Sequence, residues 1–97
     1  MKRKELFAKL LESVAQRTEL KPEQILSNDI STDTVDARHL LIYSLSQCGF
    51  YPTDIADFIG CTRRTVYYAI EHFDVRLLQS KMLRIHWEII RKQEGID

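Results

Sequence analysis

A run of hydrogen-bonding side chains between positions 62 and 68 contains the residue types best suited to binding a charged ligand. It reads Thr-Arg-Arg-Thr-Val-Tyr-Tyr. Guanidinium groups donate to guanine and to phosphate, and hydroxyl groups bond to either base edges or phosphate oxygens. The candidate DNA-contacting residues of this run are therefore Thr62, Arg63, Arg64, Thr65, Tyr67 and Tyr68.

The position of Arg63 and Arg64 strengthens this interpretation. We expect Thr62 to cap a helix, which places both arginines in its first turn. The N-terminal end of a helix carries positive partial charge, so two basic side chains there are locally unfavourable unless an anion binds. The alternative is an ordinary helical hairpin in a small α-helical core, which does not account for the arginine pair.

Two short helices would position this run. Thr53 can cap the first, and Gly60 would end it because glycine enters the left-handed conformation of a tight turn without strain. The inward positions of the first helix are Ile55, Ala56 and Ile59, and those of the second are Val66, Ala69, Ile70 and Phe73. The stretch 53–73 is thus predicted to be a helix-turn-helix, whose second helix enters the DNA major groove.

The rest of the sequence predicts more helices and no strand. Periodicity indicates an amphipathic helix from Met1 to about Arg17 and a short helix that starts at Pro22. A polar loop, 27–34, precedes a helix from about 34 to 48 that is apolar nearly all round, and we expect it to be the most buried, with Gly49 as its C-terminal cap. The prediction is an all-α, five- to six-helix orthogonal bundle in a single domain, 1–97.

A C-terminal helical extension, 75–94, is predicted to follow a cap at Asp74. Its apolar residues recur at 3-4-3-4 spacing, at Val75, Leu78, Met82, Ile85 and Ile89, and further apolar residues widen the surface. We favour packing of this face on the first helix of the same chain. A homodimer through the C-terminal helix is the alternative.

Composition limits the function in other ways. The 97 residues contain 14 basic and 14 acidic side chains, for a formal net charge of zero. Any affinity for nucleic acid must therefore come from a local patch. We expect Cys48 and Cys61 to be buried reduced thiols, and the lack of a signal peptide or long apolar run predicts a cytoplasmic protein without a membrane partner.

Catalytic and metal-binding patterns are weak in this sequence. The three histidines, His39, His72 and His86, are far apart and have no metal-ligand spacing to a cysteine or to one another. Asp54 and Asp57 are three residues apart, but their expected role is to complement a helix N-terminus. We therefore predict a protein that is not an enzyme and that has no cofactor, metal or small-molecule substrate.

The order of these segments resembles a known family. From about Val14 to Phe73, roughly two-thirds of the chain, it resembles the C-terminal DNA-binding domain of the bacterial replication initiator DnaA, with a Trp-repressor-like fold. The shared segments are Ile25-Leu26-Ser27, a loop, an Ala37-Arg38-His39 helix start and the helix-turn-helix. In that family the last motif runs FGGRDHTTVLHA, of which this chain keeps Phe58, Gly60, Thr65, Val66 and Ala69.

The departures from the family fall on the residues that contact DNA. The family's arginine becomes Cys61, its aspartate-histidine-threonine trio becomes Thr62-Arg63-Arg64, and its basic minor-groove loop corresponds to the acidic segment 29–36. The chain also has no glycine-rich phosphate loop. The resemblance therefore implies a fold and a DNA-binding surface, with a different DNA target, rather than replication initiation itself.

The sequence thus predicts a binder of double-stranded DNA with a regulatory or accessory role in replication, transcription or transposition. The segment 62–65 would contact bases and phosphates, while Tyr67, Tyr68 and Arg38 would contact the DNA backbone. The alternative is a protein–protein adaptor that keeps the fold and does not bind DNA. Zero net charge and the acidic loop favour the adaptor, and the paired arginines favour DNA.

Overall fold

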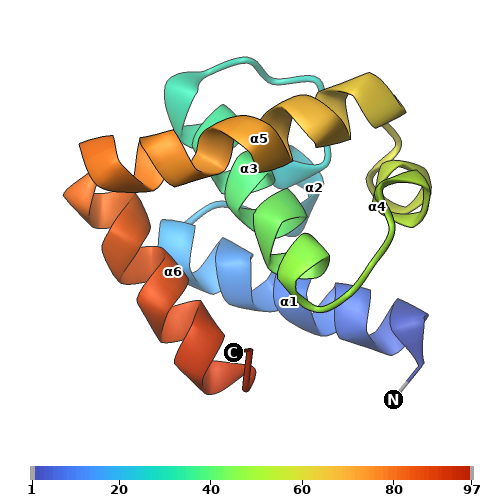
Figure 1. The fold of residues 1–97 in the computed structure, drawn as a ribbon, viewed down its shortest axis with the longest axis horizontal. Coiled ribbons are helices and arrows are strands. Elements are labelled where there is room, and N and C mark those ends of the chain that lie inside the picture. The colour runs from blue at the N-terminus through green and yellow to red at the C-terminus, as the bar shows by residue number, and fades with distance from the viewer. Residues whose placement is uncertain (1, 97) are drawn as a thin grey trace.

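The structure, a computed structural model, describes residues 2–96, and this part of the chain contains six helices and no strand, as the sequence predicted. The helices are α1 (Arg3–Thr18), α2 (Pro22–Ile25), α3 (Thr32–Gln47), α4 (Pro52–Ile59), α5 (Arg63–Gln79) and α6 (Lys81–Gln93). In Figure 1, α5 crosses in front of α3, and α6 turns back beside the end of α1. No helix in the described range is long and apolar enough to cross a bilayer.

Helix α3 is the centre of the core, which confirms the prediction from its apolar sequence. It packs against each of the other five helices. Its fully buried apolar side chains are Ala37, Leu40, Leu41, Ile42 and Leu45. Because these side chains point in several directions around α3, the other helices must surround it to cover them.

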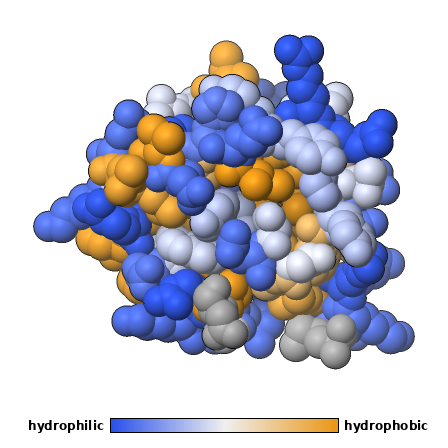
Figure 2. All heavy atoms as spheres, viewed as in Figure 1, coloured by the Kyte–Doolittle hydropathy of each residue, from blue (hydrophilic) through white to orange (hydrophobic). Residues whose placement is uncertain are grey.

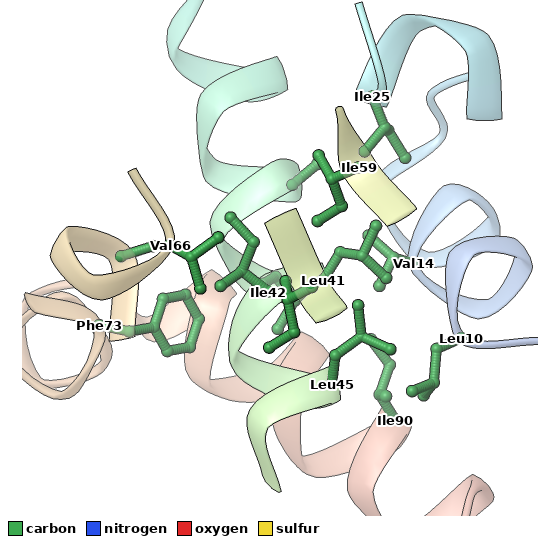
Figure 3. Close-up of a cluster of buried hydrophobic side chains, with 14 of the residues drawn as sticks. Leu10, Val14, Ile25, Leu41, Ile42, Leu45, Ile59, Val66, Phe73 and Ile90 are labelled. Carbon is green, nitrogen blue, oxygen red and sulfur yellow. The ribbon is translucent and has the colours of Figure 1, made fainter. Parts of the chain in front are cut away.

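Side chains from the surrounding helices complete this core (Figure 3). The figure shows Leu10 and Val14 of α1, Ile25 of α2, Ile59 of α4, Val66 and Phe73 of α5, and Ile90 of α6 directed toward α3. Full burial of one such side chain is worth about 1.5–3 kcal/mol before conformational entropy is subtracted. The core therefore fixes α4 and α5, the two helices that carry the predicted site.

The boundary between α5 and α6 differs from the prediction. Asp74 does not cap a helix, because α5 continues through it to Gln79. The Tyr43 hydroxyl of α3 donates to the Asp74 carboxylate at 3.1 Å. The break comes at Ser80, whose side chain accepts a hydrogen bond from the Leu83 N–H at 3.2 Å and so caps α6.

Helix α6 packs inward through Leu83, Trp87 and Ile90, against α1, α3 and α5. The Trp87 ring meets Tyr43 edge-on, with centroids 5.0 Å apart. Helix α6 therefore does pack on α1, but not through the face that the sequence predicted. The side chains predicted to form its apolar seam, Val75, Leu78, Met82 and Ile85, are exposed.

Two predicted helix ends, the start of α4 and the end of α3, can be compared with the structure. Thr53 does not cap α4, which begins one residue earlier at Pro52, because proline suits the first helical position and its fixed φ starts the turn. Gly49, at φ +93°, does end α3, and the Phe50 N–H donates to the Leu45 carbonyl.

Cys48 and Cys61 are free thiols that are half-buried rather than buried, and partial burial raises the pKa of each.

Candidate nucleic-acid interface

The turn between α4 and α5 has the conformation that its residues predicted. Gly60 adopts φ +82°, and its N–H donates to the Ala56 carbonyl at 2.8 Å. The N–H of Cys61 donates to the same carbonyl at 3.1 Å. These two bonds end α4 and reverse the chain within two residues, so that α5 starts close to where α4 stops.

Thr62 then starts α5. Its backbone is extended, and its hydroxyl accepts the Thr65 N–H at 3.2 Å, which confirms the predicted N-cap. The hydroxyls of Thr62 and Thr65 lie 3.0 Å apart and hydrogen-bond to each other. Both threonines therefore stabilise the first turn of α5, and Thr65 is half-buried rather than fully outward.

One face of α5 is held in the core and the opposite face is open to solvent. Val66, Ala69 and Phe73 are buried, as predicted. Ala56 of α4 is also buried, so a small side chain lies within the core where α4 and α5 pack together. The exposed face of the first two turns carries Arg63, Arg64, Tyr67 and Tyr68.

Arg63 and Arg64 have no partner among the described residues. Neither guanidinium forms a hydrogen bond or ion pair there, and α5 has no acidic residue in its first turn. Helices α1 to α4 each have an acidic residue in that position, whereas α6, like α5, has none. The start of α5 therefore combines two unpaired positive charges with the positive end of the helix dipole.

The basic surface is short. Glu71 is exposed and lies seven residues after Arg64, which places it on the same face of α5 two turns later. On α4, Asp57 is exposed as well. Positive charge is thus concentrated on the first two turns of α5 and does not continue along the helix.

The two tyrosines have different surroundings. Tyr67 is about half exposed, at 52%. Tyr68 stacks on His72 with ring centroids 4.0 Å apart, and the His39 ring of α3 lies 6.4 Å from that of Tyr68. Burial lowers the pKa of His39, and the charge of Arg76 lowers it further, so the neutral imidazole is favoured at pH 7.

Arg38 is committed to the fold. Its Nε donates to the Ile25 carbonyl at 2.8 Å, and its Nη2 donates to the carbonyls of Ser27 and Asp29 at 2.6 and 3.1 Å. These bonds fasten the loop between α2 and α3 to the side of α3. The sequence suggested a contact between Arg38 and the DNA backbone, whereas this geometry gives it a structural role beside the site.

The loop that Arg38 holds lies next to the α4–α5 turn. A cavity of about 180 Å³ separates them, lined by Ser27 and Asn28 of the loop and by Gly60, Cys61 and Thr65. The sequence did not indicate Ser27 or Asn28 as site residues, because only the folded arrangement brings that loop beside the turn. Their backbone and side-chain polar groups extend the surface next to Thr65.

The carboxylates of the acidic segment are largely engaged within the protein. Asp29 accepts hydrogen bonds from the Ser31 N–H and the Thr34 hydroxyl, at 3.0 and 2.9 Å. The Ser31 backbone bond, followed by the Thr34 and Gln24 side chains, lowers the pKa of Asp29 to about 2. Asp36 forms an ion pair with Arg76 of α5.

Asp33, the third carboxylate of that segment, lines a separate cavity of about 480 Å³ with Arg17 of α1 and His86 of α6. None of the residues at the α4–α5 turn borders that cavity. Of the three carboxylates in the acidic segment, Asp36 is therefore paired with a cation, whereas Asp29 stays ionised in the loop and is held by neutral donors.

The basic start of the chain lies beside α4. The Arg3 guanidinium contacts the Asp54 carboxylate at 2.9 Å, in the first turn of α4. Lys2 and Lys4 flank Arg3 and are exposed. An exposed ion pair of this kind contributes at most about 1 kcal/mol to stability, but it locates two further lysines near the α4–α5 pair.

Comparison with known proteins adds no family to this description: neither the protein-family models nor the curated proteins contain a match to this chain. Within residues 2–96, no group of three or more His, Cys, Asp or Glu side chains could hold a metal ion.

Proposed function

We propose that this protein binds double-stranded DNA by inserting the first two turns of α5 into the major groove, with α4 and α5 acting as a helix-turn-helix. The observation that carries the proposal is the exposed, unpaired Arg63–Arg64 pair at a capped helix start. An unoccupied site of this kind leaves like charges uncompensated, and a phosphate or a guanine edge would compensate them.

In this proposal the residues have separate roles. Arg63 and Arg64 supply the contacts to guanine or phosphate, and Tyr67 supplies a phenol for the DNA backbone. Thr62 and Thr65 keep the first turn rigid through their mutual hydrogen bond, which fixes the direction of the arginines. Arg38 holds the adjoining loop, 27–31, against α3.

The proposed arrangement is similar to the DnaA DNA-binding domain in its order of helices and different in its contact residues. An aspartate accepts from the cytosine amino group, whereas an arginine donates to guanine. The trio Thr62-Arg63-Arg64 therefore favours a guanine-containing site other than the initiator's box. The role would be regulatory or accessory, in replication, transcription or transposition.

A protein–protein adaptor is the second candidate. The exposed aliphatic residues of α5 and α6, together with Glu71 in the middle of the α5 face, favour this alternative. An adaptor would retain the α4–α5 pair as a structural unit and would use the apolar surface instead.

The test is enrichment of bound duplexes from a random library, followed by titration of the selected duplex. The test variant is the double variant R63A/R64A. Each of these arginines that contacts a base should, when replaced, weaken duplex binding by about 1–3 kcal/mol. Removing an arginine that binds only phosphate should instead lower the salt slope by about one.

The matched control removes two exposed lysines elsewhere, Lys21→Ala with Lys92→Ala, and should leave binding nearly unchanged. Circular dichroism of each variant establishes that it is folded. A folded R63A/R64A variant that binds the selected duplex as tightly as the parent rejects the proposed role of α5, and a parent chain that enriches no duplex supports the adaptor.

A further inference from the structure

The cavity of about 480 Å³ lies at the junction of α1, α3 and α6, away from the α4–α5 turn. The end of α1 and the first turns of α3 and α6 form its walls, and Figure 1 shows the end of α1 beside α6. Its volume is within the range of about 300–1,000 Å³ that is typical of small-molecule sites. In Figure 2, hydrophobic residues gather at the left of the view, over the α5–α6 corner, and one of the exposed aliphatic residues there, Met82, also borders the cavity.

The cavity is lined by charges of both signs that do not pair with one another. Arg17 in the last turn of α1, Glu19 just after that helix and Asp33 in the first turn of α3 are exposed. None of these three side chains forms an ion pair or hydrogen bond with a described residue. Asp36, the remaining charged side chain of the lining, is already paired with Arg76. An arginine and two carboxylates thus line one cavity without neutralising each other.

Glu19 is in the least favourable position of the three. Helix α1 ends at Thr18, and the negative partial charge at its C-terminal end disfavours a carboxylate there. Glu19 also adopts φ +59°, a left-handed conformation that favours glycine, and it is the one non-glycine residue with positive φ within residues 2–96. By contrast, Arg17 and Asp33 suit the dipoles of their helices. A cationic group bound beside Glu19 would compensate its charge.

The wall that α6 forms favours an anionic group. Burial lowers the pKa of His86, and the charge of Arg17 lowers it further, so Arg17 lies close to the α6 wall and the imidazole is neutral at pH 7. Helix α6 begins at this wall with the Ser80 cap and has no acidic residue in its first turn. Arg17 and the positive end of the α6 dipole therefore both attract negative charge.

From this arrangement we propose that the cavity binds a small zwitterion, a molecule with one carboxylate group and one ammonium group. The carboxylate lies between Arg17 and the start of α6, and the ammonium group lies at the carboxylates of Glu19 and Asp33. Ala37 and Leu83, which are buried, supply an apolar surface for the carbon atoms between the two groups. A simple anion would leave the two carboxylates without a counter-charge, and a simple cation would be repelled by Arg17.

An NMR titration of the full chain, without DNA, tests the proposal. The probes are straight-chain amino acids with the ammonium group at the end opposite the carboxylate: glycine, β-alanine, γ-aminobutyrate and δ-aminovalerate. At least one should bind and shift the amide signals of residues 17–19, 33–37 and 80–86. The carboxylic acid and the amine of the same chain length, which each carry one of the two charges, are the matched controls and should bind at least about threefold more weakly.

Variants test the two ends of the ligand separately. Arg17→Gln and Glu19→Gln should each weaken binding of the best probe by at least about threefold, the effect of losing a partly solvated ion pair. Glu71→Gln removes an exposed carboxylate of α5 outside the cavity and should leave binding unchanged. Glu19→Gly should weaken binding but raise the midpoint of thermal unfolding, because glycine relieves the left-handed conformation.

Circular dichroism establishes that each variant is folded. The proposal is overturned if no amino acid of the series shifts the signals of the cavity residues, or if the controls with one charge bind as tightly as the zwitterion. A folded E19Q variant that binds like the parent overturns it as well. Because no residue of the α4–α5 turn borders the cavity, these outcomes are independent of the proposed role of Arg63 and Arg64.

Discussion

At the scale of single residues, polar side chains decide the shape of the candidate site as much as apolar ones. Thr62 holds the first turn of α5, and Arg38 fixes the neighbouring loop through three backbone carbonyls. Sequence reasoning found the Thr62 cap because capping is a local relation between a hydroxyl and an N–H three residues on. It could not find the role of Arg38, since the carbonyls that Arg38 binds come from residues 9 to 13 positions away.

Asp29 provides a pH-dependent test of that loop. Its pKa falls from 3.8 to about 2 on folding, so its hydrogen bonds add stability that is complete above pH 4 and is lost as pH falls toward 2. We expect Asp29→Asn to be less stable than the parent at pH 6. The difference should shrink on going from pH 4 to pH 2, as the parent carboxylate is protonated.

Urea unfolding at pH 6, 4 and 2 measures this difference. Asp33→Asn removes an exposed carboxylate from the first turn of α3 and serves as the control for the loss of a negative charge. If the D29N variant is less stable than the parent by the same amount at all three pH values, the hydrogen bonds to the Asp29 carboxylate do not stabilise the folded state as described.

At the scale of elements, the sequence predicted helices more reliably than it predicted their ends. Asp74-Val75 and Ser80-Lys81 are both acceptable helix starts by residue type. The structure has the break at Ser80, and Asp74, within the unbroken α5, instead accepts a hydrogen bond from Tyr43, a residue 31 positions away. The apolar pattern of 75–89 was wrong for a related reason: its 3-4-3-4 spacing defines one face only in an unbroken helix, and the break at Ser80 divides the pattern between α5 and α6.

Helix α6 also allows a test of burial against exposure within one helix. Trp87 is 7% exposed and packs on Tyr43, whereas Met82 is 60% exposed. Trp87→Ala should lower the free energy of unfolding by about 3–5 kcal/mol, because it leaves a cavity against α3. Met82→Ala should change it by less than about 0.5 kcal/mol at protein concentrations at which the chain is monomeric.

Thermal or urea unfolding of the two variants gives both values. Equal destabilisation by W87A and M82A would mean that α6 does not attach to the core through the side on which Trp87 lies. The helix would then be oriented differently from the arrangement in Figure 1.

At the scale of the whole molecule, the zero net charge conceals an uneven arrangement. Several acidic side chains form ion pairs with basic side chains of the same chain, including Asp36 with Arg76 and Asp54 with Arg3. Arg63 and Arg64 remain without such partners among the described residues. Composition alone counts all charges equally and therefore does not show that these two arginines lie together, without partners, at one helix start.

The central position of α3 also has a consequence for how the molecule opens. Since every other helix packs on α3, no group of helices that omits α3 retains the common core. Partly unfolded forms that keep the common core must therefore keep α3, while α6 can detach at the Ser80 corner. In native-state hydrogen exchange, the amide protons of Leu40 to Leu45 should exchange only through global unfolding, and those of α6 through smaller openings. Amide protons of α3 that exchange faster than those of α6 would reverse this order of opening.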